Sequence, residues 1–530
     1  MIERALSLAA LALAFAAAPA SAQTASPSAA QAEPGTLALP PGFEPALSPA
    51  EATAIGQVVK IRRYDDGPDG LNAVIALAPD VQAQVRAAEA AGLPLAGRTV
   101  LVKDNIETRE LPTTAGSLAL ANNRTGRDAP LIANLRAAGG VVMGKANLSE
   151  WANIRDDNST SGWSAVGGLT RNPHAIDRNT CGSSSGSGAA VAAGFAWAAI
   201  GTETNGSITC PASMNGVVGF KPSVGLVSRT HVVPISSTQD TAGPMARSVQ
   251  DAALLLGAIA GEDSADQATL GIPNRVRDYT QGLENYSLEG VRIGVMRDQI
   301  GDREDLETVF ENALTDLENA GAVLVDIEFE PNEEMYGSSF AVLMYELREE
   351  MGRYLASLPP FEGQETPRSL ADLIAFNEAN ADAELRWFGQ DLFKQAEKAT
   401  DRTAYEEARA KAIRIAGEET LDVLLADNDV QFLVAPTRGP AWMSDLVNGD
   451  NFNGSVGFGS PSAIAGYPHL TVPMGAIEGL PVGLSILGAK WDDHAVLKAG
   501  AAYERARSAE LPDPQFHRWV PQGGGGPDGN

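Results

Sequence analysis

A serine-rich stretch at 181–194, CGSSSGSGAAVAAG, is the first candidate for chemistry in this chain. Residues 182–186 match the G-x-S-x-G pattern of a nucleophile elbow, with Ser184 in the nucleophile position. An elbow needs a strand that leads directly into the serine, but the preceding RNPHAIDRNTC is polar and interrupted by proline. It also needs a histidine as base, and none of the five histidines lies in a sequence context that singles it out. The surroundings therefore favour a different role for these serines.

Lys103 is a candidate base for a serine enzyme that does not use histidine. A serine hydroxyl is a poor nucleophile unless a neighbouring group takes its proton. A lysine can do this when burial keeps its amine neutral. Lys103 ends the apolar run TVLVK, which is typical of an interior strand. The alternative is a lysine at a strand end that extends to solvent.

A second candidate nucleophile, Ser207, lies in GTETNGSITCPA at 201–212. Gly206 and Ser207 follow a short apolar segment, and this order predicts a tight turn. Consecutive backbone N–H groups in such a turn can converge on an oxyanion, as acyl transfer requires. An ordinary glycine turn is the alternative interpretation.

Other kinds of site find no support in the sequence. No H-E-x-x-H motif or pair of histidines at ligand spacing is present, so we predict neither a metal nor a cofactor. No lysine completes an S-x-x-K motif. The formal net charge of −28, with a pI near 4.6, argues against nucleic acid as a partner, because phosphate binding needs clustered basic residues.

Three motifs together resemble the amidase signature family: VLVKDNIET, CGSSSGSGAAVAAG and GTETNGSITCPASMNGVVGFKPSVG. Their order and spacing also match, with 80 residues from Lys103 to Ser183 and 24 from Ser183 to Ser207. The stretches NLSEWAN, QDTAGPMARSV and VAPTRGPAW extend the resemblance to about residues 51–514.

The resemblance implies a catalytic triad of Lys103, Ser183 and Ser207. Lys103 matches the buried base, Ser183 the proton-relaying serine held by a cis peptide bond, and Ser207 the nucleophile that forms an acyl-enzyme. Ser184 matches a supporting position beside the relay serine. The oxyanion hole is implied for four backbone N–H groups, those of Thr204, Asn205, Gly206 and Ser207.

Two positions depart from the common family pattern. Asn205 stands where many relatives have a glycine, and Thr209 where they have an arginine, so the usual substrates of the family do not transfer directly. Within the family, CGSSSGSG, GTETNGSI and DLVNGDNF are most similar to bacterial peptide amidases, which remove the C-terminal amide of peptides.

The resemblance implies a serine hydrolase that converts carboxamides to carboxylate and ammonia, with peptide or small-molecule amides as substrates. A broad-specificity amidase or esterase of the same family is the alternative. A tRNA-dependent amidotransferase subunit is disfavoured by the acidity of the chain and by an N-terminal signal peptide predicted at 1–22. An inactive binding homologue is disfavoured because all three catalytic positions are filled. An esterase that uses Ser184 and a histidine is the remaining hypothesis.

The chain ends carry signals of a different kind. Arg4, the apolar run ALSLAALALAFAAAP and Ala20-Ser21-Ala22 predict a cleavable signal peptide at 1–22, hence export to the periplasm without a stable membrane anchor. We expect disorder at 23–41 and 523–530. Export permits a disulfide between Cys181 and Cys210, the only two cysteines, and two buried free thiols are the other possibility.

Alternating helix and strand patterns predict how the candidate residues are positioned. We expect helices at 80–92, 131–140 and 304–322, and strands at 98–106, 141–145, 291–298, 323–330 and 430–436. PHLTVPMG and PVGLSILG are two further predicted strands, and residues about 334–425 form a charged, helical covering subdomain. The pattern predicts one α/β domain at 42–522, with helices on both faces of a mixed β-sheet. Oligomeric state is not predicted.

Overall fold

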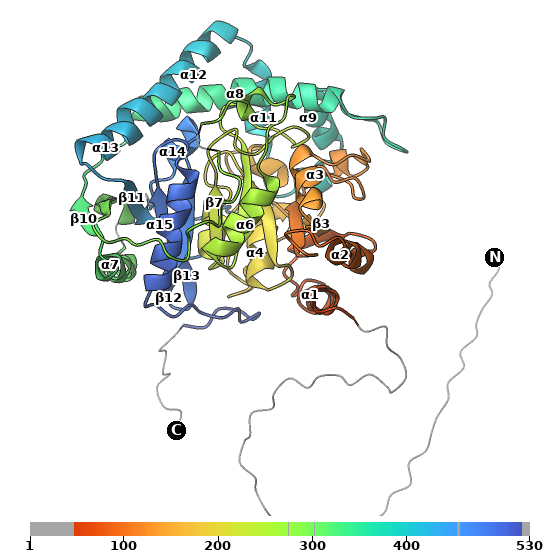
Figure 1. Ribbon diagram of the computed structural model, residues 1–530. Coiled ribbons are helices and arrows are strands. Elements are labelled where there is room, and N and C mark those ends of the chain that lie inside the picture. Colours follow the sequence, from red (N-terminus) through yellow and green to blue (C-terminus); the bar gives the residue numbers. More distant parts are fainter. Residues whose placement is uncertain (1–46, 274, 302, 453–455, 522–530) are drawn as a thin grey trace, which may run out of the picture. The chain divides into compact units, whose positions relative to one another are not determined.

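A mixed sheet of eleven strands forms the centre of the domain (Figure 1). The computed structural model describes residues 47–273, 275–301, 303–452 and 456–521. The strand order is β1-β3-β2-β6-β8-β7-β12-β13-β11-β9-β10. The strands are β1 (Val74–Leu77), β2 (Thr99–Lys103), β3 (Val141–Ala146), β6 (Ala198–Glu203), β7 (Val218–Lys221), β8 (Thr241–Ala246), β9 (Arg292–Val295), β10 (Val323–Asp326), β11 (Phe432–Pro436), β12 (His469–Ile477) and β13 (Leu480–Leu487). A separate two-stranded ribbon pairs β4 (Trp163–Ser164) with β5 (Gly168–Leu169).

The sheet combines two parallel groups with an antiparallel centre. Strand β2 pairs in parallel with β3 and β6, and β9 pairs in parallel with β10 and β11. The strands between these groups, β8, β7, β12 and β13, pair antiparallel with their neighbours. Every residue of β2, β6 and β11 is buried, because helices cover both faces there. Burial on both faces explains the continuous apolar runs that these strands show in the sequence.

Along the chain, fifteen α-helices lie before, between and after the strands of the described residues. They are α1 (Pro49–Tyr64), α2 (Val81–Ala90), α3 (Pro130–Ala137), α4 (Ser185–Ala192), α5 (Thr209–Met214), α6 (Val249–Ile259), α7 (Glu304–Asn319), α8 (Glu333–Ala356), α9 (Leu370–Ala379), α10 (Ala381–Glu384), α11 (Asp391–Lys398), α12 (Arg402–Ala416), α13 (Asp422–Asp427), α14 (Ser460–Ala465) and α15 (Asp493–Ala506). Ser48, Ser248 and Ser369 cap α1, α6 and α9 by accepting a backbone N–H from the first turn.

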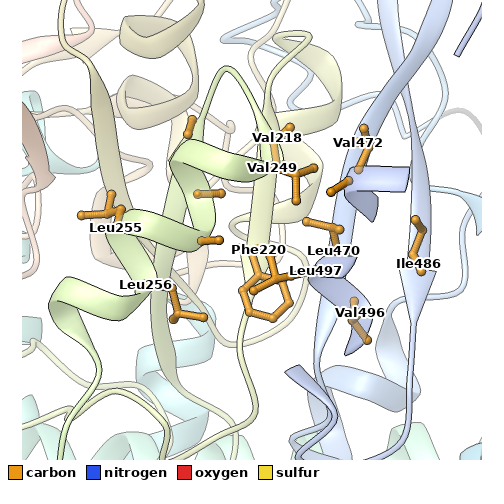
Figure 2. Close-up of a cluster of buried hydrophobic side chains, with 14 of the residues drawn as sticks. Val218, Phe220, Val249, Leu255, Leu256, Leu470, Val472, Ile486, Val496 and Leu497 are labelled. Carbon is orange, nitrogen blue, oxygen red and sulfur yellow. The ribbon is translucent and has the colours of Figure 1, made fainter. Parts of the chain in front are cut away.

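One face of the sheet packs against α3, α6, α7 and α15 in the largest apolar cluster. Figure 2 shows part of it, where Leu256 of α6 and Leu497 of α15 lie near Phe220 of β7 and Leu470 of β12. The opposite face carries α4 and α5 beneath β2, β3, β6 and β8. The predicted α/β fold, with helices on both faces of a mixed sheet, is confirmed.

Helices α8 to α13 occupy residues 333–427 and include one π-helical turn, Gly417–Leu421. Helices α8 and α12 pack on each other and cross the top of the view in Figure 1. Leu347 and Phe393 from this region belong to an apolar cluster with Leu120 and Trp151, which lie between the first and second sequence motifs, residues 100–108 and 181–194.

Several predicted boundaries were too long. Strand β2 ends at Lys103 instead of continuing to residue 106, because the chain turns there and the Ile106 N–H donates to the Lys103 carbonyl at 3.0 Å. Helix α7 ends at Asn319 and strand β10 at Asp326. The predicted signal peptide, lead-in and tail lie outside the described residues. Within the described residues, no helix is long and apolar enough to cross a bilayer.

Candidate active site

The parallel pairing of β2 with β6 brings the first and third motifs together. Val102 of β2 is in register with Ile200 of β6, so the carboxyl ends of both strands reach the same edge of the sheet. Lys103 ends β2 on the face that also carries Leu101, which packs in the cluster with α4. Polar residues at such strand ends commonly form the sites of α/β proteins.

Lys103 is completely buried, and its amine is held by neighbours from both other motifs. Its Nζ lies 2.8 Å from Ser183 Oγ, 2.8 Å from Thr202 Oγ1 and 3.1 Å from the Thr202 carbonyl oxygen. Ser183 is also completely buried and follows a cis peptide bond from Gly182. The structure thus places two of the predicted site residues in direct contact.

Burial lowers the pKa of Lys103 to about 7, although the carboxylates of Asp240 and Glu203 oppose the shift. An ammonium ion in a low-dielectric interior loses its hydration, which favours the neutral amine. The side chain of the neighbouring Asp104 pairs with Lys145, whose Nζ lies 3.1 Å from Asp104 Oδ1. Lys103 is therefore substantially unprotonated near neutral pH and able to accept a proton.

Ser184 links the serine-rich stretch to the third motif. Its Oγ donates to the Thr202 carbonyl oxygen at 3.0 Å and accepts from the Thr202 N–H at 3.2 Å. Its own N–H donates to the Ser207 carbonyl oxygen at 3.1 Å. Ser184 is completely buried in these contacts, so its hydroxyl is not presented to substrate as a nucleophile elbow requires.

Ser207 lies in the turn between β6 and α5, with 9% of its surface exposed. It borders a cavity of about 200 Å³ that Gly182 and the other turn residues also line. Gly206 has φ of +84°, a left-handed conformation that makes the turn possible. Within the described chain, no acceptor is paired with the backbone N–H groups of Thr204, Asn205, Gly206 and Ser207.

Cys181 and Cys210 form a disulfide and both line this cavity. Cys181 comes two residues before Ser183, and Cys210 lies in α5, three residues after Ser207. The bond therefore ties the serine-rich loop covalently to the helix that follows the turn. The sequence alone left a disulfide and free thiols as alternatives, because the distance between the two cysteines depends on the fold.

Comparison with known proteins identifies the family of this chain. A family model described as Amidase matches residues 61–497. An Arabidopsis thaliana protein described as a probable amidase is 36% identical over 465 residues, which cover 84% of this chain and 85% of the relative. The chain belongs to the amidase signature family. It is therefore an amidase, a hydrolase that acts on carbon–nitrogen bonds.

Solved structures of peptide amidases are similar to this amidase over most of its length. The native peptide amidase of Stenotrophomonas maltophilia is 45% identical with a TM-score of 0.81, and the alignment covers 88% of this chain and 95% of that one. A complex of the peptide amidase PAM with the competitive inhibitor chymostatin is 46% identical with a TM-score of 0.83, with the same coverage.

Sequence reasoning assigned no role to three residues that the fold brings to this site. Glu203 Oε2 accepts the N–H groups of Ile208 and Thr209 at 2.8 and 3.0 Å and so holds the start of α5. Asp240 Oδ1 accepts from Thr204 Oγ1 at 2.6 Å, and burial raises the pKa of Asp240 to about 6. The third residue, Arg438, lines the cavity. Asp240 and Arg438 lie in QDTAGPMARSV and VAPTRGPAW, the motifs that extended the family resemblance.

The two buried histidines of this amidase, His174 and His469, lie in settings that do not suit a base. Burial lowers the pKa of His469 to about 3 and that of His174 to about 4. His469 Nε2 is hydrogen-bonded to Ser485 Oγ at 2.7 Å, and His174 Nε2 to the Asn215 carbonyl oxygen at 3.1 Å. Among the described residues, no group of three or more histidine, cysteine, aspartate or glutamate side chains is arranged to hold a metal ion.

Proposed function

We propose that this amidase hydrolyses the C-terminal carboxamide of peptides through a covalent acyl-enzyme on Ser207. The observation that carries the mechanism is the 2.8 Å contact between Lys103 Nζ and Ser183 Oγ, with a Lys103 pKa of about 7. The similarity to peptide amidases over 88% of the chain supports the substrate class.

In the acylation step, Ser207 Oγ attacks the carboxamide carbon and passes its proton to Ser183 Oγ. Ser183 in turn passes its own proton to the neutral Lys103 amine. The oxyanion that forms accepts hydrogen bonds from the unpaired N–H groups between Thr204 and Ser207. The carbon–nitrogen bond then breaks while Lys103 returns a proton through Ser183, so the leaving group departs as ammonia.

Deacylation repeats this route with water in place of the amide nitrogen. Water attacks the acyl carbon and gives one proton to the Ser183–Lys103 pair. When the ester bond to Ser207 breaks, that proton returns to Ser207 Oγ. The products are the carboxylic acid and the free enzyme, and no metal or cofactor takes part in the scheme.

Two further parts of the proposal rest on the sequence. The signal-peptide pattern at 1–22 supports export to the periplasm, which cell fractionation tests: activity that stays in the cytoplasmic fraction would contradict it.

Amidotransferase subunits also occur among the relatives, one of them 33% identical. The net charge of −28 favours a peptide over tRNA as partner.

Ammonia release from a matched substrate panel tests the proposed function. The panel contains amidated dipeptides, free aliphatic carboxamides and aryl amides, each with the wild type and with the Ser207→Ala variant as control. We expect the highest kcat/KM on the amidated dipeptides and no turnover by Ser207→Ala. Equal or better turnover of simple aliphatic amides would instead support a broad-specificity amidase.

A further inference from the structure

Arg438 is a cation directed at the turn that carries Ser207. It follows β11 by two residues and lines the same cavity as Gly206 and Ser207. Its Nη2 lies 3.9 Å from the position that a Cβ atom would occupy on Gly206. The guanidinium therefore stands within the reach of a small group bound at the nucleophile.

Among the described residues, most of the hydrogen-bonding capacity of Arg438 is unused. Nη1 donates to the Val456 carbonyl oxygen at 2.9 Å, and within the described chain no other hydrogen bond or ion pair involves this side chain. A guanidinium has five N–H donors, so several remain for a ligand. Burial lowers the pKa of Arg438, against the opposing charge of Glu203, yet the group stays protonated at neutral pH.

Glu203 offsets part of this charge without forming an ion pair with it. Its Oε2 is bonded to the Ile208 and Thr209 N–H groups. A guanidinium whose charge is partly offset in this way favours a neutral oxygen acceptor over a second carboxylate. A peptide carbonyl is such an acceptor, and charged donors bind it more strongly than neutral ones.

The chemistry of the leaving group indicates which side of the substrate Arg438 meets. Ammonia is small and needs no recognition pocket, and a fixed cation beside it would disfavour its protonation. All recognition must therefore fall on the acyl side, where a peptide amide has its next carbonyl oxygen four bonds from the scissile carbon.

We propose that Arg438 is a specificity-determining residue that donates hydrogen bonds to the carbonyl oxygen of the peptide bond preceding the amidated residue. This inference rests on the proposed function. It predicts a preference for N-acylated amino acid amides over simple amides of the same shape. It also implies that a free amino acid amide, whose α-ammonium replaces the acylated nitrogen, is disfavoured by charge repulsion.

Three substrates that share one side chain test the proposal: N-acetylphenylalanine amide, phenylalanine amide and 3-phenylpropanamide. The Arg438→Met variant keeps the length of the side chain and removes every donor. We expect Arg438→Met to lower kcat/KM about 10- to 100-fold on the N-acetyl substrate, mainly through a higher KM. On 3-phenylpropanamide, kcat/KM of the variant should stay within about threefold of the wild-type value. On phenylalanine amide, the loss in kcat/KM should be smaller than on the N-acetyl substrate, or kcat/KM should rise.

Arg402→Met is the matched control, because it removes the same charge from a guanidinium on α12 that pairs with Glu406 and does not line the Ser207 cavity. It should leave all three rates within about twofold. Arg438→Lys keeps the charge and should retain more of the N-acetyl preference than Arg438→Met. This second variant also tests the proposal if Arg438→Met does not fold.

The outcomes separate this inference from the proposed function. Equal losses on the N-acetyl substrate and 3-phenylpropanamide, with a wild type that prefers the former, would overturn the role of Arg438 alone. A larger loss on succinamic acid, the monoamide of a dicarboxylic acid, would also overturn it and would identify a carboxylate as the ligand. A wild type that does not prefer N-acetylphenylalanine amide over 3-phenylpropanamide would overturn the proposed function itself.

Discussion

Replacement of Lys103 by methionine should abolish hydrolysis and at the same time stabilise the fold. Burial lowers the pKa of Lys103 to about 7 in the folded protein, whereas the unfolded chain has a lysine pKa of about 10.4. Between these values the unfolded state binds a proton that the folded state does not. The free energy of unfolding of the wild type therefore rises with pH across this window, and the variant lacks this contribution.

The two pKa values give the size of the effect. The depressed pKa costs about 4 kcal/mol of stability at pH 7 and about 2 kcal/mol at pH 9. Methionine cannot form the hydrogen bonds of Lys103 to Ser183 and Thr202. Their loss offsets roughly 1–3 kcal/mol of the stability that the variant gains by removing the buried amine. Those bonds contribute nearly equally at both pH values once Lys103 is neutral. The advantage of the variant should therefore shrink by about 2 kcal/mol between pH 7 and pH 9.

Other buried groups do not change this difference. Asp240, with a pKa of about 6, is ionised throughout the window. Lys221, with a pKa of about 8, titrates in both proteins, so its contribution cancels. Glu203, the other carboxylate that raises the pKa of Lys103, is present in both proteins as well.

Urea unfolding of the wild type and of Lys103→Met at pH 7, 8 and 9 measures the effect. Lys60→Met, on the exposed face of α1, is the matched control, because it makes the same substitution without removing a buried amine. A Lys103→Met difference that is constant from pH 7 to pH 9 would refute the reasoning, because Lys103 would then be charged in the folded protein.

Three further predictions concern catalysis. Ser207→Ala should lose both turnover and labelling by a fluorophosphonate, while Ser184→Ala keeps part of each, because of these two serines only Ser207 borders the cavity. Labelling that depends on Ser184 alone would contradict this prediction. The value of kcat/KM should rise through about pH 7 and level off above it as Lys103 loses its proton. Asp240→Asn should move this rise to lower pH, because it removes a negative charge that favours the protonated amine of Lys103. A rise in kcat/KM that stays at the same pH in Asp240→Asn would contradict the assignment of the titration to Lys103. His469→Gln should retain kcat within about tenfold in steady-state assays, and a thousandfold loss in a folded variant would argue against lysine as the base.

The catalytic candidates could be predicted from sequence because each depends on local signals. Lys103 ends a continuous apolar run, and such a run indicates a strand buried on both faces wherever it occurs. Gly206 before Ser207 marks a turn by its freedom to adopt positive φ. The spacing of three motifs then identified the family, and with it the contact between Lys103 and Ser183.

The surroundings of these residues were decided by the tertiary structure. Asp240 follows Ser207 by 33 residues and Arg438 by 231, and no periodic pattern encodes contacts over such separations. Asp240 reaches Thr204 because it immediately precedes β8, which pairs with β6. Arg438 reaches the cavity because β11 returns to the sheet late in the chain.

The cysteine pair and the end of β2 are two further features that depend on the tertiary structure. Whether Cys181 and Cys210 form a bond depends on a Cα–Cα distance of 5.9 Å, which the fold sets by packing the serine-rich loop against α5. Strand β2 ends at Lys103, where the chain turns, and the Asp104 that follows pairs with Lys145 of the neighbouring strand, a contact that its own sequence neighbours do not indicate. By itself the sequence determined which residues are candidates for the chemistry, since side-chain types and local backbone preferences are properties of short segments. Only the tertiary structure decided which charges surround them, because those charges come from strands and loops that the sheet brings together.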